Sequence, residues 1–292
     1  MNRRIEKIRN NFDSILRDKK LLRAPIAGDA LTAKICEKIG FKVINIPGIA
    51  VNTVYGQPDR GFADFYTLFI QAKQIIDNVN IPVVCDVGTG HGFAENIKRT
   101  VHSYETVGAA GICLDDGVWP KRCGEMSQMM IAPVEEMNSR IKAAVDIRKD
   151  NKFKIFAHSA ARNLFDLDNT MERYRNYLHA GVDGIYVDGI NSITELRKVG
   201  KEFKDTLLIV NANNLKRKIE WQELCKMGYS IAIFDNEIIY KRLNSEIDVL
   251  KKEHLSQVLG RKAEQSVELK DLGEIVDLDD SIELENRYIK HE

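Results

Sequence analysis

The chain of 292 residues carries 43 Lys and Arg side chains against 43 Asp and Glu, which gives a formal net charge of zero at pH 7. This balance offers no electrostatic basis for binding nucleic acid or an anionic membrane. Five scattered cysteines without a CxxC pair indicate neither a zinc cluster nor a disulfide framework, but reduced thiols in a cytoplasmic protein. The charged N-terminal stretch is not expected to be a signal peptide, and no apolar run approaches the ~20 residues that span a membrane.

Short apolar runs alternate with longer segments of helical periodicity along most of the chain. A helix outside the main fold is expected up to about Lys20. The apolar runs that follow are nearly continuous in hydrophobicity, which is typical of parallel strands covered on both faces. The expected strands are residues 21–28, 41–48, 82–88, 108–116, 153–159, 181–189, 207–213 and 230–236. Apolar spacing of about 3.6 residues predicts helices between them, among others at 94–107, 134–148 and 169–179.

Eight strand–helix units in a chain of this length predict a closed (β/α)8 TIM-type barrel rather than an open doubly wound sheet. No Gly-x-Gly-x-x-Gly sequence follows the first strand, which argues against a dinucleotide-binding fold. We expect the barrel and its N-terminal outer helix to occupy residues 1–243, and a helical, acidic appendage to occupy 244–292. Within the appendage, 244–259 fits one or two helices. The acidic stretch 264–292 either packs on a neighbouring surface or is a plain tail.

Polar residues stand where the expected strands end, at the rim that holds the active site of an α/β barrel. A single Asp after a strand is more often a turn or helix-cap residue than a functional one. Several carboxylates at neighbouring strand ends are costly unless a cation or charged ligand lies among them. The residues concerned are Asp29, Asp86, Asp115, Asp116, His158, Asp188, Asn211 and Asn213. Their convergence predicts an active site at this rim.

Two connecting loops are long enough to indicate function. After the second strand, residues 52–61 are punctuated by glycine and proline and end in a charged pair followed by glycine. After the fourth strand, residues 118–125 place Cys123 beside Lys121 and Arg122. Neighbouring cations lower the pKa of a thiol and favour its reactive form. A βα connection of this length is typical of an active-site lid.

Four segments carry a resemblance to a known family: GDALTA at 28–33, GQPD at 56–59, DVGTGHG at 86–92 and PKRCG at 120–124. With them the chain resembles the isocitrate lyase/phosphoenolpyruvate mutase superfamily, and most closely its 2-methylisocitrate lyase-like branch. The KRCG sequence marks lyases of this superfamily rather than mutases. The resemblance implies a (β/α)8 barrel that forms a homo-oligomer, a tetramer or a dimer, with C-terminal helices exchanged between barrels.

The resemblance also implies a site for Mg²⁺, with Mn²⁺ as the alternative ion. Asp86 would bind the ion directly, while Asp59 and Asp115 would hold ion-bound waters. Cys123, assisted by Lys121, would be the general acid that protonates the departing carboxylate enolate, and Asp59 is grouped with these catalytic residues. The expected substrate-binding residues are Pro47, Gly48, Ile49, Glu125, His158, Asp188 and Asn211.

Five positions of the site depart from the superfamily's pattern. They are Gly88 in place of the second strand-three aspartate, Asp115 and Asp188 in place of glutamates, Glu125 in place of histidine, and His158 in place of arginine. Loss of one carboxylate is expected to weaken Mg²⁺ binding on the order of 10–100-fold. Loss of the arginine and gain of Glu125 remove positive charge where the distal carboxylates of a tricarboxylic acid would lie. The sequence therefore predicts a substrate less anionic than isocitrate or 2-methylisocitrate, or even a cationic one.

The main functional prediction is a Mg²⁺-dependent carbon–carbon lyase, or the reverse aldol-type addition. The substrate would be a small-molecule 2-hydroxy or 2-oxo carboxylic acid that reacts through a metal-stabilised enolate. Phosphoenolpyruvate mutase, phosphonopyruvate or oxaloacetate-decarboxylase-type chemistry on the same site is one alternative. A non-catalytic metabolite-binding barrel is another, favoured by Gly88 and Ala160. We expect neither nucleic acid nor a membrane as a partner.

Overall fold

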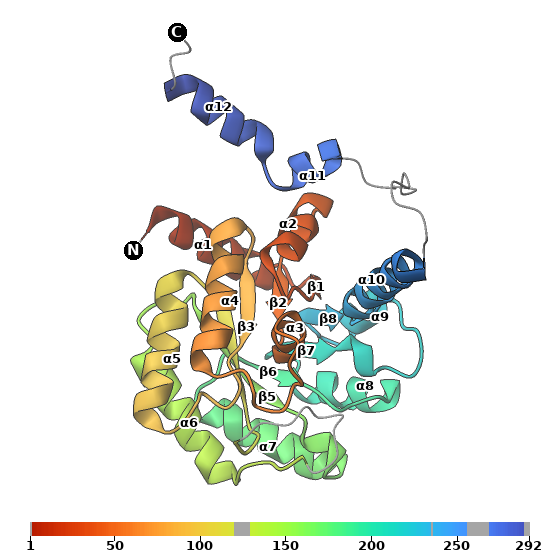
Figure 1. The fold of residues 1–292 in the computed structure, drawn as a ribbon. Coiled ribbons are helices and arrows are strands. Elements are labelled where there is room, and N and C mark those ends of the chain that lie inside the picture. Colours follow the sequence, from red (N-terminus) through yellow and green to blue (C-terminus); the bar gives the residue numbers. More distant parts are fainter. Residues whose placement is uncertain (1, 120–128, 235, 256–268, 289–292) are drawn as a thin grey trace.

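Eight parallel strands form the centre of the molecule, and helices surround them (Figure 1). The computed structural model describes residues 2–119, 129–234, 236–255 and 269–288. The strands are β1 (Leu22–Pro25), β2 (Ile44–Ile46), β3 (Val83–Asp86), β4 (Gly111–Asp115), β5 (Lys154–Ser159), β6 (Gly184–Val187), β7 (Leu207–Asn211) and β8 (Ile231–Phe234). Their order in the sheet is β1-β8-β7-β6-β5-β4-β3-β2, and a bridge between Ile26 and Asn45 brings β1 and β2 together. The barrel is nearly closed, which confirms the predicted fold class.

The helices lie on the outside of the strands, mostly one between each pair. They are α1 (Arg3–Arg17), α2 (Ala30–Ile39), α3 (Gly48–Val54), α4 (Phe65–Asn78), α5 (Ala94–Val107), α6 (Val134–Ile147), α7 (Leu167–His179), α8 (Ile193–Glu202), α9 (Trp221–Lys226), α10 (Glu237–Leu255), α11 (Leu269–Ile275) and α12 (Leu278–Tyr288), with short 3₁₀ turns at Ala161–Asn163 and Ala212–Asn214. The helices predicted at 94–107, 134–148 and 169–179 are α5, α6 and α7. The last begins two residues earlier than expected because the Asp166 carboxylate caps it, accepting from the Asn169 amide at 2.8 Å.

Apolar side chains fill both sides of the sheet, which explains the continuous hydrophobic runs in the strands. Ile112 and Ile155 belong to the core between the strands and the outer helices, whereas Phe156 belongs to the core inside the barrel. Phe12 and Leu16 of α1 are part of that inner core. The first helix therefore covers the amino ends of the strands, and the opposite, carboxyl ends remain available for a site.

The described segments of the C-terminal part, 236–255 and 269–288, are mostly helical, as predicted. α10 is one continuous helix across residues 243 and 244, where the appendage was expected to begin. Between α11 and α12, Asp277 forms ion pairs with Lys34 and Lys38 of α2, so this part of the appendage contacts the barrel. In the described ranges, no helix is both long and apolar enough to cross a membrane.

Candidate active site

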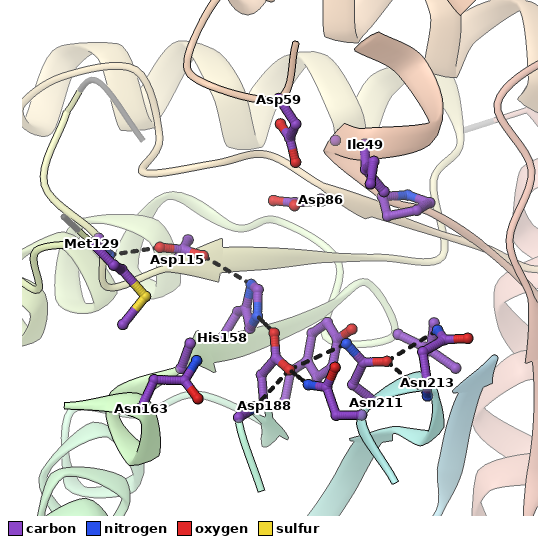
Figure 2. Close-up of a pocket in the computed structure, with 18 of the residues that line it drawn as sticks. Ile49, Asp59, Asp86, Asp115, Met129, His158, Asn163, Asp188, Asn211 and Asn213 are labelled. Atoms are coloured by element: carbon purple, nitrogen blue, oxygen red, sulfur yellow. Dashed lines mark hydrogen bonds and ion pairs between the residues drawn. The ribbon is translucent and has the colours of Figure 1, made fainter. Parts of the chain in front are cut away.

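A cavity of about 370 Å³ opens at the carboxyl ends of the strands (Figure 2). Its polar lining consists of carboxylates and amides together with one histidine. The carboxylates are Asp59, Asp86, Asp115, Asp116 and Asp188, and the amides are Asn45, Asn163, Asn191, Asn211, Asn213, Asn214 and Asn236. Pro47, Gly48, Ile49 and His158 also line it. With one exception, the structure thus brings together the predicted site residues that lie in the described part of the chain. Asp29 lies outside the cavity, where it caps α2 by accepting from the Thr32 amide and pairs with Arg242. Lys121, Cys123 and Glu125 lie outside the described residues.

Asp59 and Asp86 approach each other at one end of the cavity, which we call the acidic pole. Gly48 makes this approach possible: a Cβ atom at that position would lie 3.3 Å from Asp59 Oδ1 and 3.7 Å from Asp86 Oδ2. Asn52 holds Asp59 from the next turn of α3, donating to its Oδ1 at 2.9 Å. The Gly88 amide donates to Asp86 Oδ1 at 2.8 Å. Both carboxylates are therefore oriented by the protein itself.

The acidic pole fits a magnesium ion. Among the residues that the structure describes, no three His, Cys, Asp or Glu side chains gather closely enough to coordinate one ion together. Mg²⁺ in enzymes is commonly held by one or two carboxylates and completes its octahedron with waters and substrate oxygens. Asp86 and Asp59, with the cavity beside them, supply that kind of donor set.

A chain of polar contacts forms the opposite wall of the cavity, and we call it the polar belt. It runs through the ends of four successive strands, β4 to β7, and comprises Asp115, His158, Asp188, Asn211 and Asn213. His158 Nδ1 lies 2.9 Å from Asp115 Oδ2, and its Nε2 lies 3.0 Å from Asp188 Oδ2. Asn211 Nδ2 donates to Asp188 Oδ1 at 3.1 Å, and Asn211 Oδ1 accepts from the Asn213 amide group at 3.0 Å. Figure 2 shows the belt facing Asp59 and Asp86 across the cavity.

His158 and Asp188 at the middle of the belt are fixed from several sides. The imidazole of His158 stacks on the Tyr186 ring, with centroids 4.2 Å apart and planes 17° from parallel. Besides His158 and Asn211, the Gly189 amide donates to Asp188 at 2.7 Å, and Asn214 donates to it as well. Burial alone would raise the pKa of Asp188, but the hydrogen bond and charge of His158, followed by the backbone donor and Asn211, outweigh it and lower that pKa.

Sequence reasoning placed Asp116 at the rim without giving it a role. Its carboxylate is buried and accepts from the Ser159 hydroxyl at 2.6 Å and the Tyr177 hydroxyl at 2.8 Å. Burial, and then the neighbouring Asp115 carboxylate, raise the pKa of Asp116 above its usual value. These bonds fix the end of β4 from behind the belt. The sequence signal for this role of Asp116 was Ser159, a hydroxyl donor at the end of the neighbouring strand. β5 lies beside β4, and Ser159 directly follows His158, which pairs with Asp115.

Asn45 is another residue of the lining that the sequence did not single out, as are Asn163, Asn191 and Asn214. It lies on β2, is 1% exposed and lines the cavity. Its Nδ2 donates to the Val84 carbonyl at 3.1 Å, whereas its Oδ1 has no hydrogen-bond partner in the described structure. The sequence signal for Asn45 was a polar residue in the middle of the apolar run 41–48. Most buried polar atoms in proteins are hydrogen-bonded, so an asparagine inside a buried strand indicates a polar site next to it.

A nearly closed (β/α)8 barrel with acidic and amide side chains around a cavity at its carboxyl-end rim defines the class as a barrel enzyme. Residues 12–249 match the family model described as phosphoenolpyruvate phosphomutase. The chain belongs to this family, and thus to the isocitrate lyase/phosphoenolpyruvate mutase superfamily of carbon–carbon lyases and mutases, which confirms the resemblance seen in the sequence.

Three similar proteins illustrate the family. The 2,3-dimethylmalate lyase of Eubacterium barkeri is 34% identical over 237 residues, which cover 80% of this chain and 82% of the relative. The 2-methylisocitrate lyase of Shewanella oneidensis is 33% identical over 198 residues, 68% of each chain. A solved structure of phosphonopyruvate hydrolase in complex with oxalate and Mg²⁺ superposes with a TM-score of 0.86 at 23% identity, covering 97% of this chain and 99% of that one.

Proposed function

We propose that the protein is a Mg²⁺-dependent lyase that cleaves, or in reverse forms, a carbon–carbon bond of a small 2-hydroxy or 2-oxo carboxylic acid. The observation that carries this proposal is the acidic pole, where Asp59 and Asp86 converge on Gly48 at the edge of the cavity. The names of the two lyase relatives support it over phosphoenolpyruvate mutase or decarboxylase-type chemistry. The hydrolase solved with oxalate and Mg²⁺ supports the choice of ion and ligand.

Each residue of the site has a part in this proposal. Asp86 holds the ion, while Asp59 and Asp115 orient waters around it. Bound Mg²⁺ would supply positive charge beside the 2-oxygen and so favour loss of the 2-hydroxyl proton to Asp59. As the 2-oxo group forms, the electron pair of the carbon–carbon bond stays on the departing carbon. Cys123, with Lys121 beside it, delivers a proton from its sulfur to the carbon that keeps the electron pair.

The N-cap and first turn of α3 position the substrate at the acidic pole in this proposal. Pro47, Gly48 and Ile49 follow β2 directly and line the cavity where the oxo-acid carboxylate would lie. Gly48 has a second role, because a Cβ atom there would press on Asp59 Oδ1 at 3.3 Å and contact Asp86 Oδ2 at 3.7 Å. Glu125, His158, Asp188 and Asn211 are proposed to face the remainder of the substrate.

Oxalate, a planar mimic of the enolate of a 2-oxo acid, tests the proposal. We expect calorimetric titration to show binding in the presence of Mg²⁺ that a chelator abolishes. Asp86→Asn should weaken that binding at least ~10-fold, because the neutral amide is a poorer magnesium ligand than the carboxylate. Absence of oxalate binding with and without Mg²⁺ would contradict the proposal and favour a non-catalytic barrel.

A further inference from the structure

The polar belt places a carboxylate of the protein beside each ring nitrogen of its histidine. Both ring nitrogens of His158 lie within 3.0 Å of a carboxylate oxygen, one from Asp115 and one from Asp188. Asp188 in turn accepts from His158, the Gly189 amide, Asn211 and Asn214. Of these two contacts, only that of Nε2 with Asp188 has the geometry of a hydrogen bond. A substrate carboxylate that approached either nitrogen would meet the carboxylate of Asp115 or Asp188 beside it.

The belt also carries no net positive charge. With a doubly protonated His158 it sums to one negative charge, because two carboxylates flank one imidazolium. With a neutral imidazole the sum is more negative still. No lysine or arginine lines the cavity in the described part of the chain, whereas five aspartates do. A second carboxylate on the substrate would face like charges in a partly buried space, where charge–charge interactions are stronger than in water.

The same wall offers groups that suit an uncharged polar substituent. Asparagine amides from the ends of β7 and β8 line this side of the cavity. On the floor, the buried Oδ1 atom of Asn45 is a hydrogen-bond acceptor without a partner in the described structure. An acceptor of this kind is satisfied by a hydroxyl or an amide N–H, but never by an ionised carboxylate, which has no proton to donate.

We propose that the substrate carries its only carboxylate at the acidic pole and presents an uncharged hydroxyl- or carboxamide-bearing group to the polar belt. This inference rests on the proposed function, since it assumes that the metal end of the substrate lies at Asp59 and Asp86. His158 and Asp188 are positioning residues in this arrangement. They hold the asparagine amides in place and exclude a second anionic group.

A matched pair of ligands tests the inference. N-oxalylglycine and N-oxalylglycinamide share a metal-chelating oxalyl end and differ only in whether the distal group is a carboxylate or a carboxamide. In calorimetric titrations with Mg²⁺ present, we expect the amide to bind at least ~10-fold more tightly than the acid. Equal affinities, or tighter binding of N-oxalylglycine, would overturn the inference.

Oxalate separates this inference from the proposed function on which it rests. If oxalate and Mg²⁺ bind but the acid is preferred over the amide, the metal site stands and the uncharged-substrate inference falls alone. If oxalate does not bind, the proposed function is contradicted, and the inference is contradicted as well because it rests on that function. The three titrations use the same full-length protein and the same buffer.

A variant at the rim gives an independent check. Asn191 lines the cavity but is exposed, so Asn191→Lys adds a cation facing the distal group without disturbing the core. We expect it to raise the affinity for N-oxalylglycine ~5-fold or more while changing the affinity for N-oxalylglycinamide less than ~2-fold. Asn191→Gln is the control of similar length without charge and should change neither. If Asn191→Lys has the same preference for N-oxalylglycinamide over N-oxalylglycine as the wild type, the electrostatic basis of the inference is contradicted.

Discussion

Gly88 is the residue at which this chain departs most directly from the metal-binding pattern of its superfamily. Its φ of +55° lies in the left-handed region, and a Cβ atom added there would meet nothing within 4 Å. The space beside Asp86 is thus open, and the backbone conformation is one that Asp and Asn adopt more readily than other residues with a side chain. If relatives carry an aspartate here, as the sequence resemblance implies, this site lacks the carboxylate rather than the room for it.

Gly88→Asp should therefore restore a carboxylate next to Asp86. We expect Mg²⁺ affinity, measured by calorimetry, to rise ~10-fold, and the free energy of unfolding to fall by ~1 kcal/mol because of the left-handed backbone. Gly88→Asn is the matched control, with the same shape and backbone cost but no charge. Equal Mg²⁺ affinity in the two variants would show that position 88 does not face the ion.

Arg9 connects the first helix to the amino-end side of the barrel. Its guanidinium is 1% exposed, donates from Nε to the Ala109 carbonyl at 3.0 Å and pairs with Asp150 at 2.9 Å. It also lies over the Phe153 ring, 5.1 Å from the centroid. Burial alone would raise the pKa of Asp150, but the Lys152 amide and Arg9 together lower it. At the scale of elements, this contact fixes α1 against the segments that precede β4 and β5.

Asp150→Asn should weaken this attachment. The folded-state pKa of Asp150 is depressed, so its contribution to stability is fully present above its unfolded pKa near ~4 and is lost as pH falls through the lower, folded value. We expect the variant to be ~1–3 kcal/mol less stable than wild type in urea unfolding at pH 7, and the difference to shrink toward pH 3. The exposed Asp248→Asn should change stability by less than ~0.5 kcal/mol. A difference for Asp150 that is constant with pH would be inconsistent with the ion pair.

The elements were predictable from the sequence to a greater extent than the site. All eight strands lie within their expected ranges, because burial on both faces leaves a hydrophobic run that is visible residue by residue. The expected ranges were longer, since the apolar runs continue past the last ladder hydrogen bond. The belt was not predictable in the same way. Asp115 and His158 meet because β4 and β5 pair in the register that places them side by side, and no local pattern encodes that register.

At the scale of the whole molecule, the C-terminal helices leave apolar side chains uncovered. On α12, Leu278, Ile282, Leu284 and Tyr288 are all exposed, and α12 extends away from the barrel in Figure 1. Leu278 and Ile282 share one face of the helix, and Leu284 and Tyr288 share another. Exposed apolar side chains gathered on one element are typical of surfaces that contact another protein. With the helix exchange that the sequence resemblance implies, we propose that residues 244–292 act as an appendage that joins copies of the chain into a tetramer or a dimer.

Ile282→Lys tests this proposal, because it places a charge on the face of α12 that Ile282 shares with Leu278. A lysine buried between two copies would have to lose its hydration without a partner, so we expect the assembly to dissociate at least partly at low micromolar concentration. Light scattering after size-exclusion chromatography measures the change in molar mass. Glu283→Lys introduces the same side chain one position further along, on a different face of the helix, and should leave the mass unchanged. A wild-type protein of monomeric mass, or an Ile282→Lys protein of unaltered mass, would mean that α12 does not hold copies together. The exposed apolar side chains of α12 would then be expected to contact a different protein.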